Sequence, residues 1–138
     1  MLHPEISRQT RTAIAAMALQ LPGVSIVPFR MKLDDFERTP ICFDKWQGLL
    51  ETGPDPRVLL LMADPFTTPT AEILESLDLA APGLPAVGAL ASGAKRPGGH
   101  VLVLNDSLHR SGLIGVSLGG DIRADVIVSQ GYKPVGRF

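Results

Sequence analysis

The order of hydrophobic and polar residues predicts strands near the start of the chain. Residues 13–21 combine two patterns: the alanines favour a helix, whereas apolar residues at every second position favour a strand. The turn sequence Leu-Pro-Gly-Val follows at residues 21–24, and residues 24–33 have the composition of a strand that ends in an acidic pair. From these segments we predict a β-hairpin.

The next segment, residues 34–56, has no regular hydrophobic period. Prolines and a glycine interrupt it, and only residues 44–50 have the spacing of a short helix. We therefore predict a loop that contains one short helix.

A strand, a helix and a second strand are predicted in the middle of the chain. Residues 57–63 form the continuous apolar run of a strand that is covered on both faces. Thr68 and Pro69 are a typical helix N-cap and first helical residue, and apolar residues then recur at helical spacing up to Ala80. Residues 84–90 supply the next strand. This order predicts a βαβ unit with parallel strands.

Short connections separate the strands predicted for the second half. After a glycine-rich stretch, strands are expected at residues 100–104, 112–118 and 122–129, joined by turns that contain Asn-Asp and Gly-Gly-Asp. These connections are too short for crossovers, so the strands should be antiparallel. The predicted fold class is therefore α/β: a single domain with one mixed sheet, in which a βαβ unit is followed by an antiparallel meander.

The composition is that of an ordinary globular domain. Of the 138 residues 45% are hydrophobic, enough to bury a core without disulfides or metals. We expect one domain over residues 13–138 and a disordered or frayed segment over residues 1–12. The formal net charge is −1 with both signs mixed along the chain, which argues against nucleic acid as a partner. No apolar run approaches the roughly 20 residues that cross a bilayer.

The cysteine usage and the N-terminus bear on localisation. The lone Cys42 cannot form an internal disulfide, and the N-terminus lacks the pattern of a secretory signal. We therefore expect a cytoplasmic protein. Basic and hydroxyl residues among residues 1–12 are faintly similar to an organellar transit composition, so an organellar stroma is the alternative.

A series of short motifs resembles the FIST domain family. In order, the motifs are ADPF at residues 63–66, VGALASG at 87–93, RPGG at 96–99, GLIGVSLGG at 112–120 and VSQG at 128–131. The resemblance spans about residues 13–136 and depends on the order of the motifs rather than on any one of them. It implies an intracellular domain that senses small molecules, amino acids among them, and is coupled to signalling partners.

Two departures from the family pattern bear on function. Family members are usually more than twice as long, and this chain resembles the later part of their N-terminal half and the start of their C-terminal half. After the Ser-Gln-Gly motif the family commonly has a cysteine and then an arginine, where this chain has Tyr132 and Lys133. If that cysteine serves ligand binding or redox sensing, this chain has lost the feature.

The carboxyl ends of the two parallel strands form the main candidate site, because open α/β sheets tend to bind ligands there. The first strand ends at Asp64 and the second at Ser92 and Gly93, so these residues should lie at one edge. Asp64 could pair with the ammonium group of an amino acid while backbone amides near Gly93 face its carboxylate. The alternative is that Asp64 only bonds to the backbone of its own turn. The resemblance adds Ser129 and Gln130 as candidate ligand contacts.

The remaining chemical groups give weaker indications. Residues 92–99 carry glycines and two cations that could cradle an anion, but no helix is predicted after them, so a surface loop is favoured. Cys42 has apolar neighbours, and His100 and His109 flank a predicted turn without a third metal ligand. Trp46 is either an anchor for a partner or, as we favour, a core residue. We predict no catalytic residue, metal or cofactor.

Two functions of different classes are consistent with these patterns. The first is a small-ligand-binding sensory module, with an amino acid as the favoured ligand class. The second is a shortened structural or interaction subunit that binds a protein partner or further copies of itself without a ligand. An enzyme is the least supported class.

Overall fold

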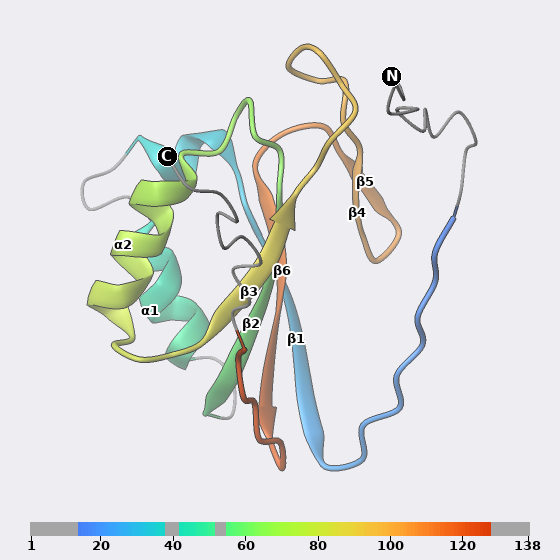
Figure 1. Ribbon diagram of the computed structural model, residues 1–138. Helices are drawn as coiled ribbons and strands as arrows, with labels where there is room; N and C mark the ends of the chain where they lie inside the picture. Colours follow the sequence, from blue (N-terminus) through green and yellow to red (C-terminus); the bar gives the residue numbers. More distant parts are fainter. Residues whose placement is uncertain (1–13, 38–41, 52–54, 128–138) are drawn as a thin grey trace, which may run out of the picture.

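The computed structural model describes residues 14–37, 42–51 and 55–127 (Figure 1). In these residues the chain forms two α-helices, one 3₁₀ helix, a four-stranded sheet and a separate two-stranded sheet. In chain order the elements are β1 (Val24–Met31), the 3₁₀ helix η1 (Leu33–Phe36), α1 (Phe43–Glu51), β2 (Pro56–Ala63), α2 (Thr70–Ala80), β3 (Ala86–Leu90), β4 (Leu102–Leu104), β5 (Ser107–His109) and β6 (Leu113–Gly120).

The four-stranded sheet is mixed and has the strand order β1-β6-β2-β3. β2 and β3 are parallel and α2 lies between them in the sequence, which confirms the predicted βαβ unit. β6 runs antiparallel to both β1 and β2, and β4 pairs with β5 in the small antiparallel sheet. The predicted α/β class, with parallel pairing first and antiparallel pairing afterwards, is therefore confirmed.

Both α-helices cover the same face of the four-stranded sheet, and the hydrophobic core lies between the helices and that face (Figure 1). Trp46 of α1 is completely buried, and its ring meets Phe29 of β1 edge to face with 5.9 Å between the ring centroids. This confirms Trp46 as a core residue. The predicted apolar face of α2 is present, because Ile73 and Leu77 are both buried in the same core.

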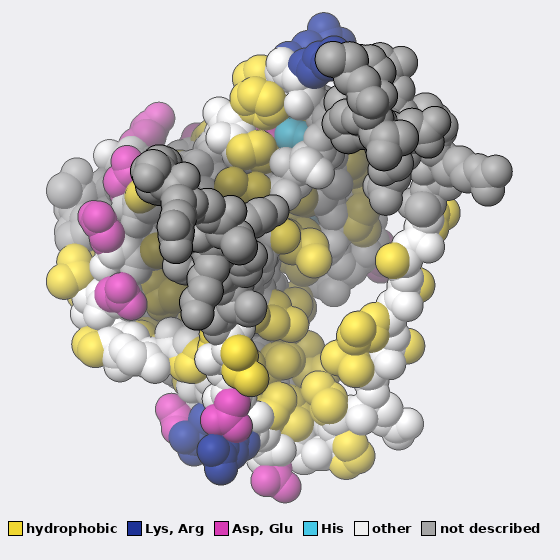
Figure 2. All heavy atoms as spheres, viewed as in Figure 1, with side chains coloured by type: hydrophobic (Ala, Val, Ile, Leu, Met, Phe, Trp, Pro, Cys, Tyr) yellow, Lys and Arg dark blue, Asp and Glu magenta, His cyan; other side chains and the backbone are white. Residues whose placement is uncertain are grey.

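The other face of the four-stranded sheet carries apolar side chains that the described residues leave open. Leu60 and Met62 of β2 are 41% and 59% exposed, and Ile26 of β1 lies in the same layer. In Figure 2, hydrophobic side chains lie on the side of the sheet that faces away from the helices. The prediction that β2 is covered on both faces is therefore wrong for the described chain, because a continuous apolar run does not reveal whether both faces are filled.

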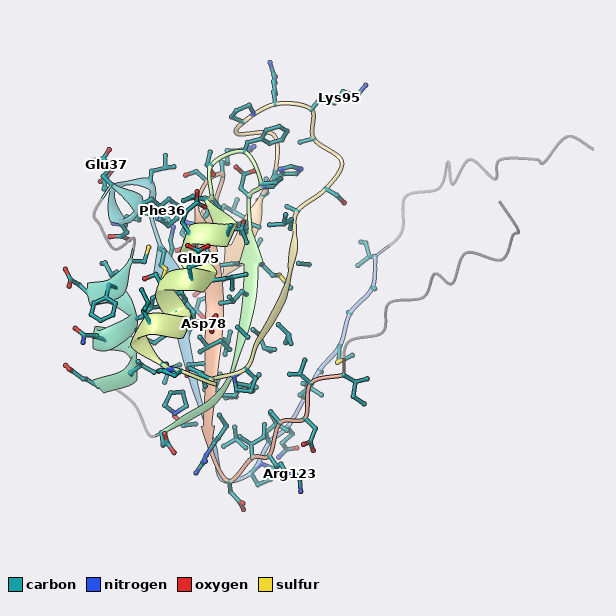
Figure 3. All side chains as sticks on the ribbon, turned by 60° about the vertical axis from the view of Figure 1, so that its left-hand side comes forward. Phe36, Glu37, Glu75, Asp78, Lys95 and Arg123 are labelled. Atoms are coloured by element: carbon teal, nitrogen blue, oxygen red, sulfur yellow. The ribbon has the colours of Figure 1, made fainter. Side chains whose placement is uncertain are left out.

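Residues 14–21 do not form the predicted hairpin with β1. The turn after them is present, since the Val24 N–H donates to the Leu21 carbonyl at 3.3 Å. β1 nevertheless pairs with β6, in a register that runs from Val24 opposite Gly120 to Met31 opposite Leu113. Residues 14–21 run as an extended segment apart from the sheet in Figures 1 and 3.

Pro28 gives a physical reason for the missing hairpin. The Asp121 N–H donates to the Gly23 carbonyl at 3.0 Å, so odd-numbered residues of β1 direct their backbone groups toward β6. Even-numbered residues direct theirs toward the free edge, where a hairpin partner would pair. Pro28 is one of these and has no N–H to donate, which weakens pairing at the middle of this edge.

Two further local predictions differ from the structure, and one short strand was missed. Residues 122–127 form no strand, because the Ile122 N–H donates to the Gly120 carbonyl at 2.8 Å in a tight turn that ends β6; residues 128 and 129 lie outside the described part. The acidic pair that was expected to end the first strand lies in η1. β5 was not predicted, because three residues are too few for a recognisable pattern. The short helix expected at residues 44–50 is confirmed as α1.

The helices of the described part are short. α1 has 9 residues and α2 has 11, and no described helix is long and apolar enough to cross a membrane.

Candidate functional site

The carboxyl ends of β2 and β3 lie at the same edge of the four-stranded sheet, as predicted from their parallel pairing. β2 ends at Ala63 and β3 at Leu90, and the Ala91 N–H donates to the Ala63 carbonyl at 2.9 Å. β6 begins at this edge as well, since the Asp64 N–H donates to the Gly112 carbonyl at 3.0 Å. Two loops leave from here: residues 64–69, which lead to α2, and residues 91–101, which lead to β4.

Asp64 is the most completely enclosed charged residue of this edge, with 0% of its surface exposed. Its Oδ1 lies 2.7 Å from Nδ1 of His100, and its Oδ2 accepts a hydrogen bond of 2.6 Å from the Thr67 hydroxyl. The Thr67 oxygen in turn accepts the Gly112 N–H at 2.9 Å. The carboxylate thus joins the two loops and the start of β6 through hydrogen bonds on both of its oxygens.

His100 is buried and uses both ring nitrogens within the chain. The Ala94 N–H donates to Nε2 at 3.1 Å, so Nε2 carries no proton and Nδ1 is the nitrogen that donates to Asp64. The ring of Phe66 stacks on the imidazole with 5.7 Å between centroids and an interplanar angle of 20°. Neither ring nitrogen is left over for a metal ion or for proton transfer, so His100 holds the loop in place.

Opposing effects act on the pKa of Asp64. Burial, the largest of them, raises the pKa of the carboxyl group. Hydrogen bonds from Thr67, His100 and the Phe66 N–H outweigh burial and hold the pKa of Asp64 below its ordinary value. The residue is therefore a carboxylate at neutral pH, and its negative charge is held inside the edge of the sheet.

The predicted site residues are only partly brought together. Asp64 is linked to the loop that contains Ser92 and Gly93 only through His100, which accepts the Ala94 N–H of that loop; Gly93 has the left-handed φ of +102° that favours glycine. The Asp64 carboxylate bonds to the Phe66 N–H of its own turn, as the alternative interpretation expected, but also to the Thr67 hydroxyl and to His100 of the other loop. Contact with a ligand stays a prediction. Ser129 and Gln130 lie outside the described residues.

Sequence reasoning missed the link between Asp64 and His100. The two residues are 36 positions apart, and no local pattern in the sequence joins them. A usable signal was present, because Asp64 follows the end of β2 and His100 ends the loop that follows β3. Parallel strands bring those two points to one edge.

An apolar cavity of about 180 Å³ lies between α2, the carboxyl half of β2 and the whole length of β3, and Asp64, Ser92 and Gly93 do not line it. We call it the helix-side cavity. The first residue of α2, Thr70, borders it, and the N-cap residue of that helix, Pro69, makes no side-chain cap. Thr68, the predicted cap, instead donates its hydroxyl to the Gly112 carbonyl at 2.9 Å. The lining consists of Leu61, Ala63, Thr70, Ile73, Leu74, residues 86–90 and Leu113.

The other chemical groups of the described chain do not form a second site with catalytic geometry. Lys95 lies at the tip of the loop after β3 and points away from the molecule in Figure 3, as expected for a surface loop. His109 lies at the end of β5, where burial and then the charge of Arg30 lower its pKa. Among the described residues no three metal-ligating side chains come together.

Cys42 is expected to react slowly with thiol reagents in the folded protein. It is buried against the Asp35 carbonyl, and burial, with the nearby Asp35 charge, raises its pKa to about 11 although Lys45 opposes this. Because the thiolate is the reactive form, a disulfide reagent such as DTNB should label the native chain far more slowly than the chain in urea. Equal rates in the two conditions would contradict this burial.

The comparison with known proteins places the chain in a family. Uncharacterized protein Mb0898c of Mycobacterium bovis is 38% identical over 77 residues, which cover 56% of this chain and 20% of that protein. Uncharacterized proteins MT0656 and Rv0628c of Mycobacterium tuberculosis are 39% identical over 77 residues, with the same coverage. The matched stretch is therefore only a fifth of the length of these curated relatives. No solved structure matches the chain. The FIST N domain family matches residues 4–138, nearly the whole sequence, and the chain belongs to this family.

Proposed function

We propose that this chain is a small-ligand-binding sensory module, and that its ligand is an apolar amino acid. FIST domains are sensory domains of signal transduction, which gives the general class. The observation that carries the proposal is the helix-side cavity, which runs along β3 to the carboxyl edge of two parallel strands and reaches the first turn of α2, whose N-cap residue Pro69 makes no side-chain cap. Such edges are where open α/β sheets bind their ligands.

The size of the helix-side cavity limits the apolar part of the ligand. Its volume is about 180 Å³. An apolar cavity of roughly 150 Å³ holds a benzene molecule, so the side chain of leucine or isoleucine fits this one. Leu61, Ile73 and Leu74 would surround that side chain. Its burial would contribute about 2 kcal/mol to the free energy of binding.

The first turn of α2 offers groups that suit a carboxylate. The first amide N–H groups of a helix have no acceptor within the helix, and the N-cap residue Pro69 has no side-chain acceptor to offer them. The positive end of the helix dipole also favours an anion. Because Thr70 begins α2 and borders the helix-side cavity, a carboxylate bound at this turn would lie next to the apolar lining.

Asp64 has an indirect role in this proposal. It fixes the loop that contains Ser92 and Gly93, and its buried negative charge favours a ligand ammonium group at the same edge. The Ser92 hydroxyl and the backbone near Gly93 would complete the polar side of the site. Ser129 and Gln130 of the Ser-Gln-Gly motif remain predicted ligand contacts.

Replacing Leu74 with tryptophan is expected to abolish binding of L-leucine. Leu74 lines the helix-side cavity but is partly exposed, so the larger ring can fill the space without disturbing the core. Native mass spectrometry of the chain mixed with L-leucine should show a one-to-one adduct for the unchanged protein. The Leu74→Trp variant should lose most of that adduct, corresponding to a drop in affinity of roughly tenfold or more.

Leu79→Trp is the matched control, because Leu79 is an exposed leucine of the same helix that does not line the cavity. This variant should bind L-leucine as the unchanged chain does, and glycine should form no adduct with any of the three proteins. An equal loss of leucine binding in both tryptophan variants would remove the helix-side cavity from the proposal, as would an adduct that survives Leu74→Trp.

The alternative function is an interaction subunit that binds no ligand. The apolar side chains on the open face of the sheet favour it, since large exposed apolar patches mark interaction surfaces. In the same mass spectra, an oligomer that never carries an amino-acid adduct, with any of the twenty amino acids, would favour this function over the sensory one.

A further inference from the structure

Residues 14–21 form an extended apolar segment without a strand partner in the described chain, and we call this segment the arm. It contains no charged residue. Ile14 and Met17 are 94% and 85% exposed, which leaves unusually large apolar side chains in water. Alternate side chains of an extended segment point to opposite sides, so Met17, Leu19 and Leu21 share one side, whereas Ile14, Ala16 and Ala18 share the other.

The edge of the sheet nearest to the arm is a poor partner for it. The arm joins β1 through the turn at residues 21–24, and the outward backbone groups of β1 are interrupted by Pro28. An added strand would lack one hydrogen bond in the middle of its pairing with β1. The arm accordingly runs apart from β1 in Figures 1 and 3.

β3, at the opposite edge of the sheet, has a complete row of outward backbone groups. The Pro85 carbonyl accepts the Leu59 N–H, and the Ala91 N–H donates to Ala63, each at 2.9 Å. Odd-numbered residues therefore face β2, and the N–H and C=O groups of Ala86, Gly88 and Leu90 face outward. No strand pairs with this edge in the described chain, and no charged residue or proline within β3 blocks it.

Apolar cavities border β3 on both faces of the sheet. The helix-side cavity of about 180 Å³ is one, and a second cavity of about 390 Å³ lies on the open face, where Met62, Val103 and Ile114 line it. Val87, Gly88 and Ala89 of β3 line both. An edge strand with a cavity on each side is suited to a further strand, whose alternate side chains enter the two cavities.

The arm matches this edge in pattern and size. Its larger side chains, Met17 and Leu19, lie on one side and suit the larger open-face cavity. On the other side, Ala16 and Ala18 would border the helix-side cavity without filling it. Ile14 and Gln20 share that side and would lie beyond the two ends of the five-residue edge when residues 15–19 pair with β3. Hydrogen bonds along the edge would give affinity, and the two unequal cavities would fix which side of the arm faces the helices.

A chain cannot easily place the arm on its own β3. β1, β2 and β3 run in the same direction, so a strand added beside the start of β3 lies four strand spacings, about 19 Å, from the start of β1, where the arm is attached. Crossing that distance takes about six residues at roughly 3.3 Å each. Too few of the arm's residues would remain to pair along the five residues of β3. The free edge of a second copy has no such constraint.

We propose that the arm of one copy adds as a strand to β3 of a second copy, and that reciprocal exchange of the two arms gives a closed dimer. Each chain contributes its arm at one edge of its sheet and β3, as the strand that accepts an arm, at the other. In a two-fold assembly, reciprocal exchange pairs both arms with both β3 strands, so no arm is left unpaired to extend the assembly into a filament. The dimer does not depend on the proposed ligand, because the alanines leave the helix-side cavity open.

Native mass spectrometry of the full chain and of a Leu19→Lys variant tests this assembly. The unchanged chain should give a dimer at twice the 14.7 kDa chain mass at micromolar concentration, and Leu19→Lys should shift it to the monomer. Leu79→Lys is the matched control, since Leu19 and Leu79 are 66% and 65% exposed in the single chain. It should remain dimeric, and circular dichroism should show that both variants are folded.

A cross-linking experiment identifies the surface in contact. Unlabelled Leu19→Cys chains are mixed with isotope-labelled Ala89→Cys chains and treated with a bismaleimide. We expect a cross-linked product that contains one labelled and one unlabelled chain. The control mixture, with Leu79→Cys in place of Leu19→Cys, should not give this product. A monomeric unchanged chain would overturn the proposal. A dimer that survives Leu19→Lys, or one that gives no product between positions 19 and 89, would overturn it as well.

Discussion

Replacing Asp64 with alanine is expected to lower the free energy of unfolding by about 3 kcal/mol. The substitution removes an acceptor that is completely buried and leaves the Nδ1–H of His100 and the hydroxyl of Thr67 without their partner. Each lost hydrogen bond to a charged group costs about 1.5–3 kcal/mol, and partial rearrangement reduces the sum. Urea unfolding of the two proteins, followed by tryptophan fluorescence, measures the difference.

Asp55→Ala is the matched control for this substitution. Asp55 also carries an ion pair, with Arg57, but its side chain is 75% exposed, so the change should cost less than about 0.5 kcal/mol. Similar small losses for the two variants would show that the buried hydrogen bonds of Asp64 contribute little to stability.

The pH dependence of the Asp64 contribution has a definite sign. The pKa of Asp64 in the folded chain lies below its value of about 3.9 in an unfolded chain. The stabilisation is therefore complete above about pH 4 and is lost as the pH falls through the lower, folded-state pKa. In the Asp64→Asn variant this titration is absent. The difference in unfolding free energy between wild type and Asp64→Asn should thus be constant near neutrality and shrink in acid.

Replacing Trp46 with alanine is expected to cost about 4 kcal/mol, the largest effect of any single truncation in the core. Trp46 is completely buried between the helices and the sheet and stacks edge to face on Phe29. Truncation leaves a cavity that the surrounding side chains cannot close. Because Trp46 is the sole tryptophan of the chain, unfolding should be followed by circular dichroism.

The Trp46→Phe variant separates the contribution of side-chain volume to stability from the contribution of the indole nitrogen. Trp46 Nε1 has no hydrogen-bond partner among the residues that the structure describes, so losing it removes no bond seen there. The phenylalanine variant should therefore lose less than half of what the alanine variant loses. Equal losses would mean that the indole nitrogen makes a contribution that its surroundings do not explain.

The elements that were predicted well from the sequence are those that depend on residues close together in the chain. α2 follows from apolar residues at helical spacing, with Ile73 and Leu77 on the buried face. β2 follows from its uninterrupted apolar run, and the parallel pairing of β2 and β3 follows from the helix between them. The common edge of these strands was predictable for the same reason.

The features that sequence patterns missed depend on partners far away in the chain. Residues 13–21 combine a helix pattern with a strand pattern, from which a hairpin was predicted. The pairing of β1 was instead decided by β6, more than eighty residues later, and by Pro28 at the other edge. Thr68 is a residue type that commonly caps helices, yet its hydroxyl donates to the carbonyl of Gly112, 44 positions away. The contact between Asp64 and His100 has the same character.

The central claim is that a small apolar amino acid binds at the carboxyl edge of β2 and β3. Titrating the ¹⁵N-labelled chain with L-leucine, while its amide signals are recorded by NMR, tests the place as well as the fact of binding. We expect signals from Thr70 to Glu72 and from Ser92 and Gly93 to shift progressively, and signals of β1 at the opposite edge to stay still. Unmoved spectra, or shifts confined to the open face of the sheet, would contradict the account.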